Sequence, residues 1–167
     1  YAKLQSGETV VDLGSGAGFD CFIASHKVGP TGTVIGVDMT TKMLDRAREN
    51  AQKGSFNNVE FRLGQIEHLP VADSSANVII SNCVVNLSPD KPQVFREAFR
   101  ILQSGGRMVL SDLVLTRELS PALKNSVEAY VGCVSGASQK TDYLRMIMAA
   151  GFTKVEILAE HRYEVGL

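Results

Sequence analysis

The chain has 167 residues, of which 44% are hydrophobic and 21% charged, and its formal net charge at pH 7 is −1. This length suits one domain with a single sizeable core, and the composition is that of an ordinary α/β domain rather than a disordered or fibrous chain. Without a broad basic surface, an apolar run of about 18 residues or a recognisable leader, we expect a cytoplasmic protein with no nucleic-acid or membrane partner.

Strand-like and helix-like segments alternate along the first half of the chain. A helix is expected at 19–28, where apolar residues recur at helical spacing before a Gly-Pro-Thr-Gly turn. Thr40 or Thr41 is expected to cap a second helix, which is apolar on one side. The expected strands of this half are 9–13, 33–38, 59–63 and 78–81.

The second half continues the alternation. A helix is expected at 89–102, with Gly105-Gly106 releasing the chain into a strand at 107–113. Two more helices, at about 120–130 and 141–150, precede a strand at 153–158. The pattern predicts an α/β fold, a doubly wound, mostly parallel sheet with helices on both faces, formed by one domain over residues 1–167.

A glycine-rich turn follows the first strand. The run Gly14-Ser15-Gly16-Ala17-Gly18 comes directly after Leu13, and an acid, Asp38, closes the second strand. Glycine tolerates positive φ and has no Cβ, so a turn of this kind lets a ligand lie against the backbone. Because ligands of such sheets bind beyond the carboxyl ends of the strands, Asp12, Asp38 and Asn82 are expected around one pocket.

The acid before the turn narrows the choice of ligand. Asp12 would repel a pyrophosphate but suits a cationic amino group, and Phe19 departs from the dinucleotide-binding glycine pattern. S-adenosylmethionine offers an ammonium for Asp12 and ribose hydroxyls for Asp38. Two simpler interpretations stay open: Asp12 caps the following helix, and Gly18 is a packing glycine.

These residues resemble motifs I and II of the class I S-adenosylmethionine-dependent methyltransferases. The resemblance implies a Rossmann-like fold in which Gln65 and Ile66 border the adenine and Asn82 the methionine end. The cofactor-binding set that it implies is Asp12, Gly14, Ser15, Gly16, Gly18, Asp38, Met39, Gln65, Ile66 and Asn82.

Three cysteines, an odd number without a secretion signal, favour thiols over disulfides. Cys83 follows the fourth strand, in Ser81-Asn82-Cys83, and Cys133 lies in Tyr130-Val131-Gly132-Cys133 after a helix. Cysteine is commonly a small buried hydrophobe, so a packing role for each stays open at this point.

The chain also resembles the arsenite methyltransferases, on the segments at 12–22 and 64–70 and above all on those of Cys83 and Cys133. The resemblance implies that Cys83 and Cys133 hold trivalent arsenic as substrate, supplied as arsenite or a thiol conjugate with a thiol reductant. Cys21 also matches the family, but it lies on a helix face, and we expect it to have a packing role. The family carries a further cysteine upstream of motif I, and residues 1–11 contain none. We therefore expect a fragment lacking terminal segments, which holds monomethylated arsenic better than arsenite.

Other functions stay open. The acceptor could be a small organic molecule such as a quinone-type ring, or the domain could bind S-adenosylmethionine without catalysis. The three histidines lack the spacing of a metal site, so none is expected. Arg96, Glu97 and Arg100 are expected on the solvent-facing side of their helix.

Overall fold

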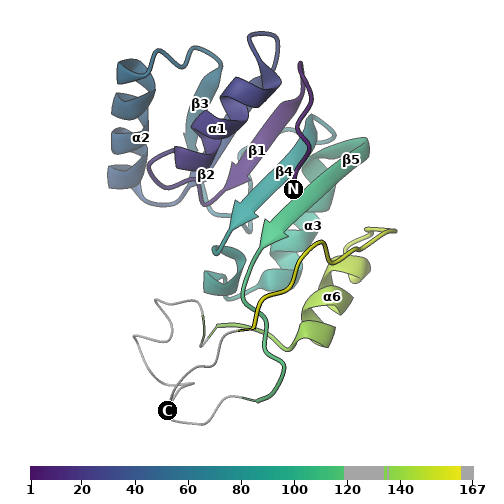
Figure 1. Ribbon diagram of the computed structural model, residues 1–167. Helices are drawn as coiled ribbons and strands as arrows, with labels where there is room; N and C mark the ends of the chain where they lie inside the picture. Colours follow the sequence, from purple (N-terminus) through teal and green to yellow (C-terminus); the bar gives the residue numbers. More distant parts are fainter. Residues whose placement is uncertain (119–133, 135, 163–167) are drawn as a thin grey trace.

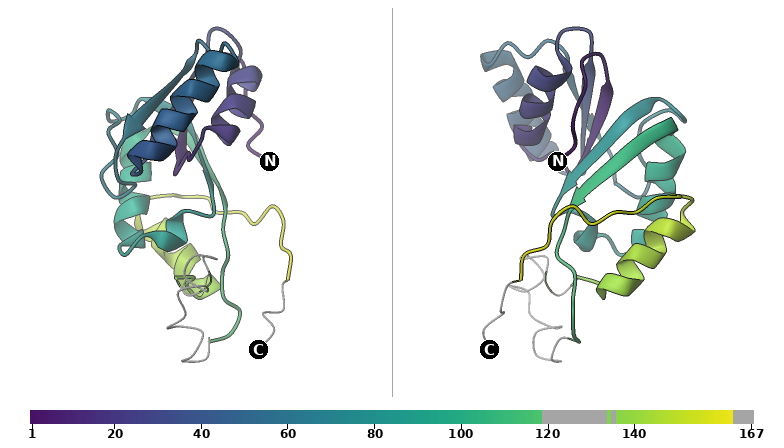
Figure 2. Two further views of the ribbon diagram at one scale, coloured as in Figure 1. Left: turned by 90° about the vertical axis from the view of Figure 1, so that its left-hand side faces the viewer. Right: turned by 45° about the vertical axis from the view of Figure 1, so that its right-hand side comes forward.

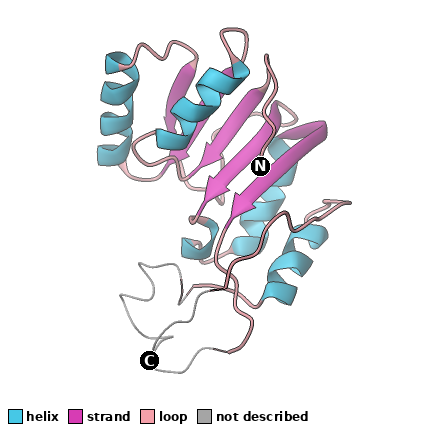
Figure 3. Ribbon diagram, viewed as in Figure 1, coloured by secondary structure: helices cyan, strands magenta, loops and turns pink. Residues whose placement is uncertain are grey.

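The computed structural model describes residues 1–118, 134 and 136–162. Its centre is a five-stranded sheet of order β3-β2-β1-β4-β5 in which every neighbouring pair is parallel (Figures 1 and 3). The strands are β1 (Thr9–Leu13), β2 (Thr33–Asp38), β3 (Val59–Leu63), β4 (Ala76–Asn82) and β5 (Leu102–Ser111). The expected parallel α/β sheet is confirmed.

Helices cover both faces of the sheet, as Figure 2 shows from the side. The helices are α1 (Phe19–Val28), α2 (Thr41–Lys53), α3 (Lys91–Ile101) and α6 (Lys140–Ala149), with a short 3-10 turn, η1 (Val85–Leu87). One core cluster joins α1 and α2 to the sheet, and a second joins α3 and α6 to its other face. The fold is therefore doubly wound, because the crossovers through α1 and α2 lie on one face and the crossover through α3 lies on the other.

The strand order reverses beside β1. The chain proceeds from β1 outward to β2 and β3, then returns to place β4 on the other side of β1. Leu13, the last residue of β1, pairs with Val37 of β2 and with Ser81 of β4. The loops that follow β1, β2 and β4 therefore emerge together, at the position where sheets of this kind bind ligands.

Three predicted elements differ from the structure. The third long helix ends at Ile101 and β5 begins at Leu102, so Gly105-Gly106 lies inside the strand. Thr40 precedes α2, but its side chain makes no capping bond; its backbone N–H donates to Asp38 Oδ1 instead, at 2.8 Å. The segment at 153–158 forms no strand: its apolar side chains are largely exposed, and β propensity yields a strand only where a neighbour pairs with it.

The helix predicted at 120–130 lies outside the described residues. Within the described ranges, the structure contains no helix long and apolar enough to cross a membrane.

Candidate active site

The turn after β1 adopts the backbone that its glycines permit. Gly14, Gly16 and Gly18 all have positive φ, at 68°, 53° and 92°. Gly16 is the most open: within the described part of the chain, a Cβ there would meet a single atom within 4 Å, Met43 Cε at 3.4 Å. Space beside Gly16 suits the close approach of a ligand to the backbone.

Gly14 and Gly18 have packing reasons as well. A Cβ on Gly14 would lie 2.4 Å from Val84 Cγ2, and one on Gly18 would lie 2.8 Å from the rings of Phe22 and Phe61. Gly18 is thus closely packed against Phe22 and Phe61, which agrees with its interpretation as a packing glycine. Gly14 brings the glycine turn into direct contact with the loop after β4.

Asp38 organises the turn from the end of β2. Its Oδ2 accepts a hydrogen bond from the Gly16 backbone N–H at 2.9 Å, and its Oδ1 accepts from Thr40 N–H at 2.8 Å. The side chain stays partly exposed, and the following Met39 is 71% exposed. A carboxylate oxygen can accept more than one hydrogen bond, so Asp38 retains capacity for a ligand's hydroxyl groups.

Asp12 is buried beneath the turn, with 3% of its surface exposed. Burial raises the pKa of its carboxyl to about 7; a hydrogen bond from Cys21 Sγ, at 3.2 Å, opposes this rise, and the negative charges of Asp20 and Asp38 add to it. The interpretation of Asp12 as a helix cap is wrong, because the N-cap residue of α1 is Gly18. The three acids make this region favourable for a cation and unfavourable for a pyrophosphate.

The loop between β3 and β4 carries the two residues expected at the adenine. Gln65 is exposed, while Ile66 is 9% exposed and packs into the core between the sheet and α3. The side chain of Gln93 on α3 donates to the Glu67 carbonyl at 3.1 Å, and the Glu67 carboxylate accepts from Ser88. The loop is thus tied to α3 immediately after Ile66.

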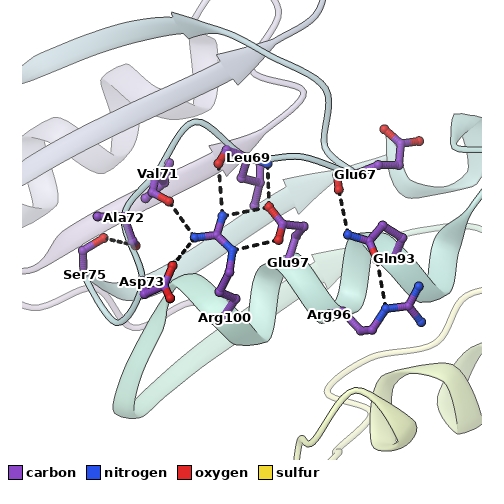
Figure 4. Close-up of polar contacts among 10 residues, drawn as sticks. All are labelled: Glu67, Leu69, Val71, Ala72, Asp73, Ser75, Gln93, Arg96, Glu97 and Arg100. Carbon is purple, nitrogen blue, oxygen red and sulfur yellow. Dashed lines mark hydrogen bonds and ion pairs between the residues drawn. The ribbon is translucent and has the colours of Figure 1, made fainter.

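Glu97 and Arg100 of α3 tie down the rest of this loop, and the expectation that they lie on a simple solvent-facing surface is wrong (Figure 4). Glu97 accepts from Leu69 N–H at 2.7 Å and pairs with Arg100, which lowers the pKa of Glu97. Arg100 donates to the carbonyls of Leu69 and Val71 and to Asp73. The side chain of Glu97 is 13% exposed because the loop covers it.

Asn82 and Cys83 lie at the end of β4, and both are exposed. Cys83 has a φ of 54°, which is unusual for a residue with a side chain, and its backbone N–H donates to the Ser111 carbonyl at 2.8 Å. Partial burial raises the pKa of its thiol, and the charge of Asp112 adds to this. Cys133, the other expected arsenic ligand, lies outside the described residues.

Asp112 and Tyr143 were missed by the sequence analysis. Asp112 follows β5, and its Oδ2 accepts from the Tyr143 hydroxyl of α6 at 2.6 Å. Its Oδ1 is buried with no hydrogen-bond partner in the described part of the chain, and burial raises the pKa of this carboxyl to about 6 despite the positive charge of Lys91. The sequence analysis placed Asp112 inside the strand expected at 107–113, whereas β5 ends at Ser111, so this acid was not recognised as lying at a strand end.

The segment immediately after Cys133 in sequence meets the loop that carries Cys83. A Cβ on Gly136 would lie 2.1 Å from the Asn86 carbonyl oxygen, so the two backbones touch. The Asn86 side chain donates to the Leu113 carbonyl at 2.7 Å, and Leu115 forms a bridge with Gln139. Residues 136–139 therefore contact both the loop after β4 and the loop after β5.

Within residues 1–118, 134 and 136–162, no group of three or more His, Cys, Asp or Glu side chains could hold a metal ion.

Cys21 is fully buried among apolar residues of α1 and α2, as its expected packing role requires.

Comparison with known proteins agrees with this geometry. The family described as "methyltransferase domain" matches residues 4–151. An arsenite methyltransferase of Halobacterium salinarum is 55% identical over 157 residues, covering 94% of this chain and 40% of that protein. A demethylmenaquinone methyltransferase of Lactococcus lactis is 33% identical over 125 residues, covering 75% of this chain and 49% of that protein.

Among solved structures, an arsenic (III) S-adenosylmethionine methyltransferase from Chlamydomonas reinhardtii superposes with a TM-score of 0.83 at 37% identity, covering 92% of this chain and 54% of that one. The chain thus spans about half the length of these relatives, or less. On the match over residues 4–151, the chain belongs to the methyltransferase-domain family.

Proposed function

We propose that this chain is the catalytic domain of an arsenite methyltransferase, which moves a methyl group from S-adenosylmethionine to trivalent arsenic bound by Cys83 and Cys133. One observation carries the proposal: Cys83 is exposed at the end of β4, and its neighbour Val84 packs against Gly14 of the glycine turn. A thiol is thereby held beside the loop that suits a cationic cofactor. The proposed compartment is the cytoplasm, where a thiol reductant regenerates trivalent arsenic.

The proposed cofactor fits the residues around the turn. Asp12 faces the ammonium group, Asp38 accepts from the ribose hydroxyls, and the backbone at Gly16 allows close approach. The remaining members of the proposed set are Gly14, Ser15, Gly18, Met39, Gln65, Ile66 and Asn82. An orphaned polar atom supports the fit, because Ser15 Oγ is buried without a hydrogen-bond partner in the described residues. When bound, the cofactor supplies an electrophilic methyl group on a sulfonium.

Soft thiolate ligands suit trivalent arsenic. The contact between Gly136 and Asn86 supports a shared site, since each of these residues is three positions from one of the two cysteines. Three residues of chain span about 10 Å at most. Arsenic bound by sulfur keeps a lone pair and would attack the methyl carbon itself; the carbon–sulfonium bond would break, S-adenosylhomocysteine would leave, and the arsenic, now formally pentavalent, would be returned to the trivalent state by the thiol reductant. The domain's main tasks are therefore to orient and align the reactants.

The raised pKa of Cys83 determines how arsenic is captured. The thiol is protonated at neutral pH, so its proton must leave when the sulfur–arsenic bond forms. With an arsenic hydroxide the proton leaves as part of water, and with a thiol conjugate it leaves on the displaced thiol. Both exchanges balance without a redox step.

The test uses the full-length protein with S-adenosylmethionine, a thiol reductant and either arsenite or methylarsenite. Methylated arsenic species are expected from the wild type, and Cys83→Ser and Cys133→Ser should lose this activity by more than about 100-fold. Calorimetry should show that both variants bind S-adenosylmethionine as the wild type does. Full arsenic methylation by both variants would overturn the proposal.

The similarity to a demethylmenaquinone methyltransferase supports one alternative acceptor, a quinone-type ring. The same variants decide between the two functions, because ring methylation does not require thiolate ligands. Methylation of a quinone-like acceptor that survives in Cys83→Ser, together with no arsenic product from the wild type, would favour the alternative.

A further inference from the structure

Asp112 stands beside Cys83 at the ends of two neighbouring strands. Asn82 of β4 pairs with Ser111 of β5, so Cys83 and Asp112 are the next residues along the two segments. The Cys83 N–H donates to the Ser111 carbonyl at 2.8 Å, which continues the hydrogen bonding between the strands past their last paired residues. Because parallel strands lie about 5 Å apart, Cys83 and Asp112 are close neighbours.

Tyr143 of α6 holds the Asp112 carboxylate. Its hydroxyl donates to Asp112 Oδ2 at 2.6 Å. Tyr143 is 4% exposed, and its ring packs edge-on against Phe95 of α3 at a centroid distance of 5.3 Å. Burial and the charge of Asp112 raise the pKa of the Tyr143 hydroxyl, so it stays protonated and remains a donor. One oxygen of the carboxylate is therefore fixed in place.

The other oxygen, Asp112 Oδ1, is shielded from water and has no hydrogen-bond partner among the described residues. A charge that is shielded from water acts more strongly on its neighbours. Burial opposes ionisation of this carboxyl, whereas the Tyr143 hydrogen bond and the charge of Lys91 on α3 favour it. The field of Asp112 reaches the Cys83 sulfur, because partial burial and then Asp112 raise the pKa of that thiol.

The proposed reaction places a positive charge beside this carboxylate. As the arsenic lone pair forms the arsenic–carbon bond, the electron pair of the carbon–sulfur bond remains on the departing sulfur. The positive charge of the sulfonium thereby passes to arsenic, which Cys83 is proposed to hold. Arsenic is neutral before the transfer, so a fixed negative group at that place stabilises the transition state more than the starting complex.

We propose that the Asp112 carboxylate stabilises the positive charge that arsenic gains during methyl transfer, and that Tyr143 is the positioning residue that holds this carboxylate. The inference rests on the proposed function, because it needs arsenic at Cys83. It also accounts for an acid at a place where it disfavours the Cys83 thiolate. The field that opposes proton loss from sulfur favours a cation on the atom that the sulfur binds.

The experiment uses the full-length protein at about pH 8, where Asp112 is ionised because its pKa is about 6. Asp112→Asn removes the charge at nearly constant size, Asp112→Glu retains the charge, and Tyr143→Phe removes the hydrogen bond but keeps the ring. Methylarsenite is bound first, S-adenosylmethionine is then added, and methyl transfer is followed in a single turnover. Calorimetry measures the affinity for methylarsenite separately. Alkylation by iodoacetamide, located by mass spectrometry in the peptide that carries Cys83, measures the reactivity of this thiol without any cofactor.

Loss of the charge should change the rate of transfer and the thiol in opposite directions. Asp112→Asn should slow methyl transfer by about 10-fold to 100-fold. Its affinity for methylarsenite should not fall, and Cys83 should be alkylated faster, because the negative charge that opposed the thiolate is gone. Asp112→Glu should recover part of the rate, and Tyr143→Phe should slow the transfer by about 3-fold to 10-fold.

Asp142→Asn is the matched control, because Asp142 is an exposed acid of α6 that pairs with Arg145 at the surface. It should change neither methyl transfer nor alkylation. The inference would be overturned by any of three results for Asp112→Asn: an unchanged rate of transfer, an equal fall in rate and in arsenic affinity, or unchanged alkylation of Cys83. If Asp112→Asn does not fold, Tyr143→Phe carries the test, and an unchanged rate of transfer would overturn the inference. No methylated arsenic from the wild type would instead defeat the proposed function.

Discussion

At the scale of the residue, Asp38 serves both the fold and the proposed ligand. Its two carboxylate oxygens hold the backbone N–H groups of Gly16 and Thr40, which fixes the turn after β1 against the start of α2. The same carboxylate stays partly exposed at the end of β2. Loss of Asp38 should therefore loosen the turn after β1 and remove the proposed contact with the ribose hydroxyls.

We expect Asp38→Ala to weaken binding of S-adenosylmethionine by about 10-fold to 100-fold, because charge-assisted hydrogen bonds contribute about 1.5–3 kcal/mol. Titration calorimetry of the full-length protein measures the change. Asp45→Ala is the control, since Asp45 is an exposed acid of α2 with a surface ion pair. Unchanged affinity in Asp38→Ala would contradict the role given to this carboxylate.

Residue types and spacing predicted the candidate site where a polar or glycine residue lies at the end of a strand. Asp38 and Asn82 belong to this group. Asp112 was missed because the predicted strand extended past it to residue 113, whereas β5 ends at Ser111. The buried bond between Asp12 and Cys21 could not be predicted, because it depends on how closely α1 packs on β1. Helical periodicity places Cys21 on a buried face without identifying the carboxylate that it meets.

At the scale of the element, α3 supports the loop between β3 and β4. Arg100 bonds the carbonyls of Leu69 and Val71, and Glu97 bonds the Leu69 N–H (Figure 4). The apolar pattern of α3 correctly predicted its buried side. It could not predict that a loop covers part of the other side, because the loop's path is set by long-range contacts.

Arg100→Ala should lower the free energy of unfolding by about 1–3 kcal/mol, since it leaves loop carbonyls without their donor. Affinity for S-adenosylmethionine should also fall, because the same loop carries Gln65 and Ile66. Arg100→Lys should recover little, since one ammonium cannot reproduce the guanidinium's several directed bonds. Urea denaturation and calorimetry measure the two effects.

Arg96 provides the matched comparison for this prediction. It lies on the same helix, and its side chain donates to Gln93 Oε1 of that helix at 2.9 Å rather than to the loop (Figure 4). Arg96→Ala should change stability by less than about 0.5 kcal/mol. Equal losses from the two alanine variants would show that Arg100 does not hold the loop.

Gly136 tests the contact between the two cysteine-bearing segments. Its Cβ would lie 2.1 Å from the Asn86 carbonyl oxygen, so Gly136→Ala must push the segment away. We expect arsenic methylation to fall by at least about 10-fold while affinity for S-adenosylmethionine is kept. Gly105→Ala, at a strand position with nothing within 4 Å, should affect stability and not methylation. Equal methylation by the two variants would argue against the shared site.

At the scale of the whole molecule, the reversal of strand order places the proposed cofactor loop and the Cys83 loop on neighbouring strands. The alternation of strands and helices predicted the doubly wound fold, because the central strands are continuous apolar runs, as in buried parallel sheets, and helical segments separate them. It mispredicted 153–158, where residues typical of a strand have no partner strand in the described structure. Pairing is a property of the assembled sheet rather than of the segment.

Asp12, which is buried, and Asp112, which is half-buried, should make stability depend on pH in an unusual direction. Asp12 and Asp112 have pKa values raised by burial to about 7 and about 6, so the native state holds protons that the unfolded state has released. Their contribution to the free energy of unfolding therefore falls as the pH rises from about 4 to about 7. Most carboxyl groups with lowered pKa values act in the opposite sense.

Asp12→Asn should remove the contribution of Asp12. The free energy of unfolding of this variant, relative to the wild type, should increase as the pH rises from about 5 to about 7 and then level off. Denaturant titrations at several pH values measure the difference, and Asp45→Asn, an exposed acid, should give a flat one. A flat difference for Asp12→Asn would contradict the raised pKa.

The packing of Val84 against Gly14 has an evolutionary consequence. Because a methyl group added at position 14 would overlap the side chain at position 84, neither position can drift on its own. Descendant sequences that enlarge one should trim the other. The loop that carries Cys83 and the proposed cofactor loop are therefore expected to change together.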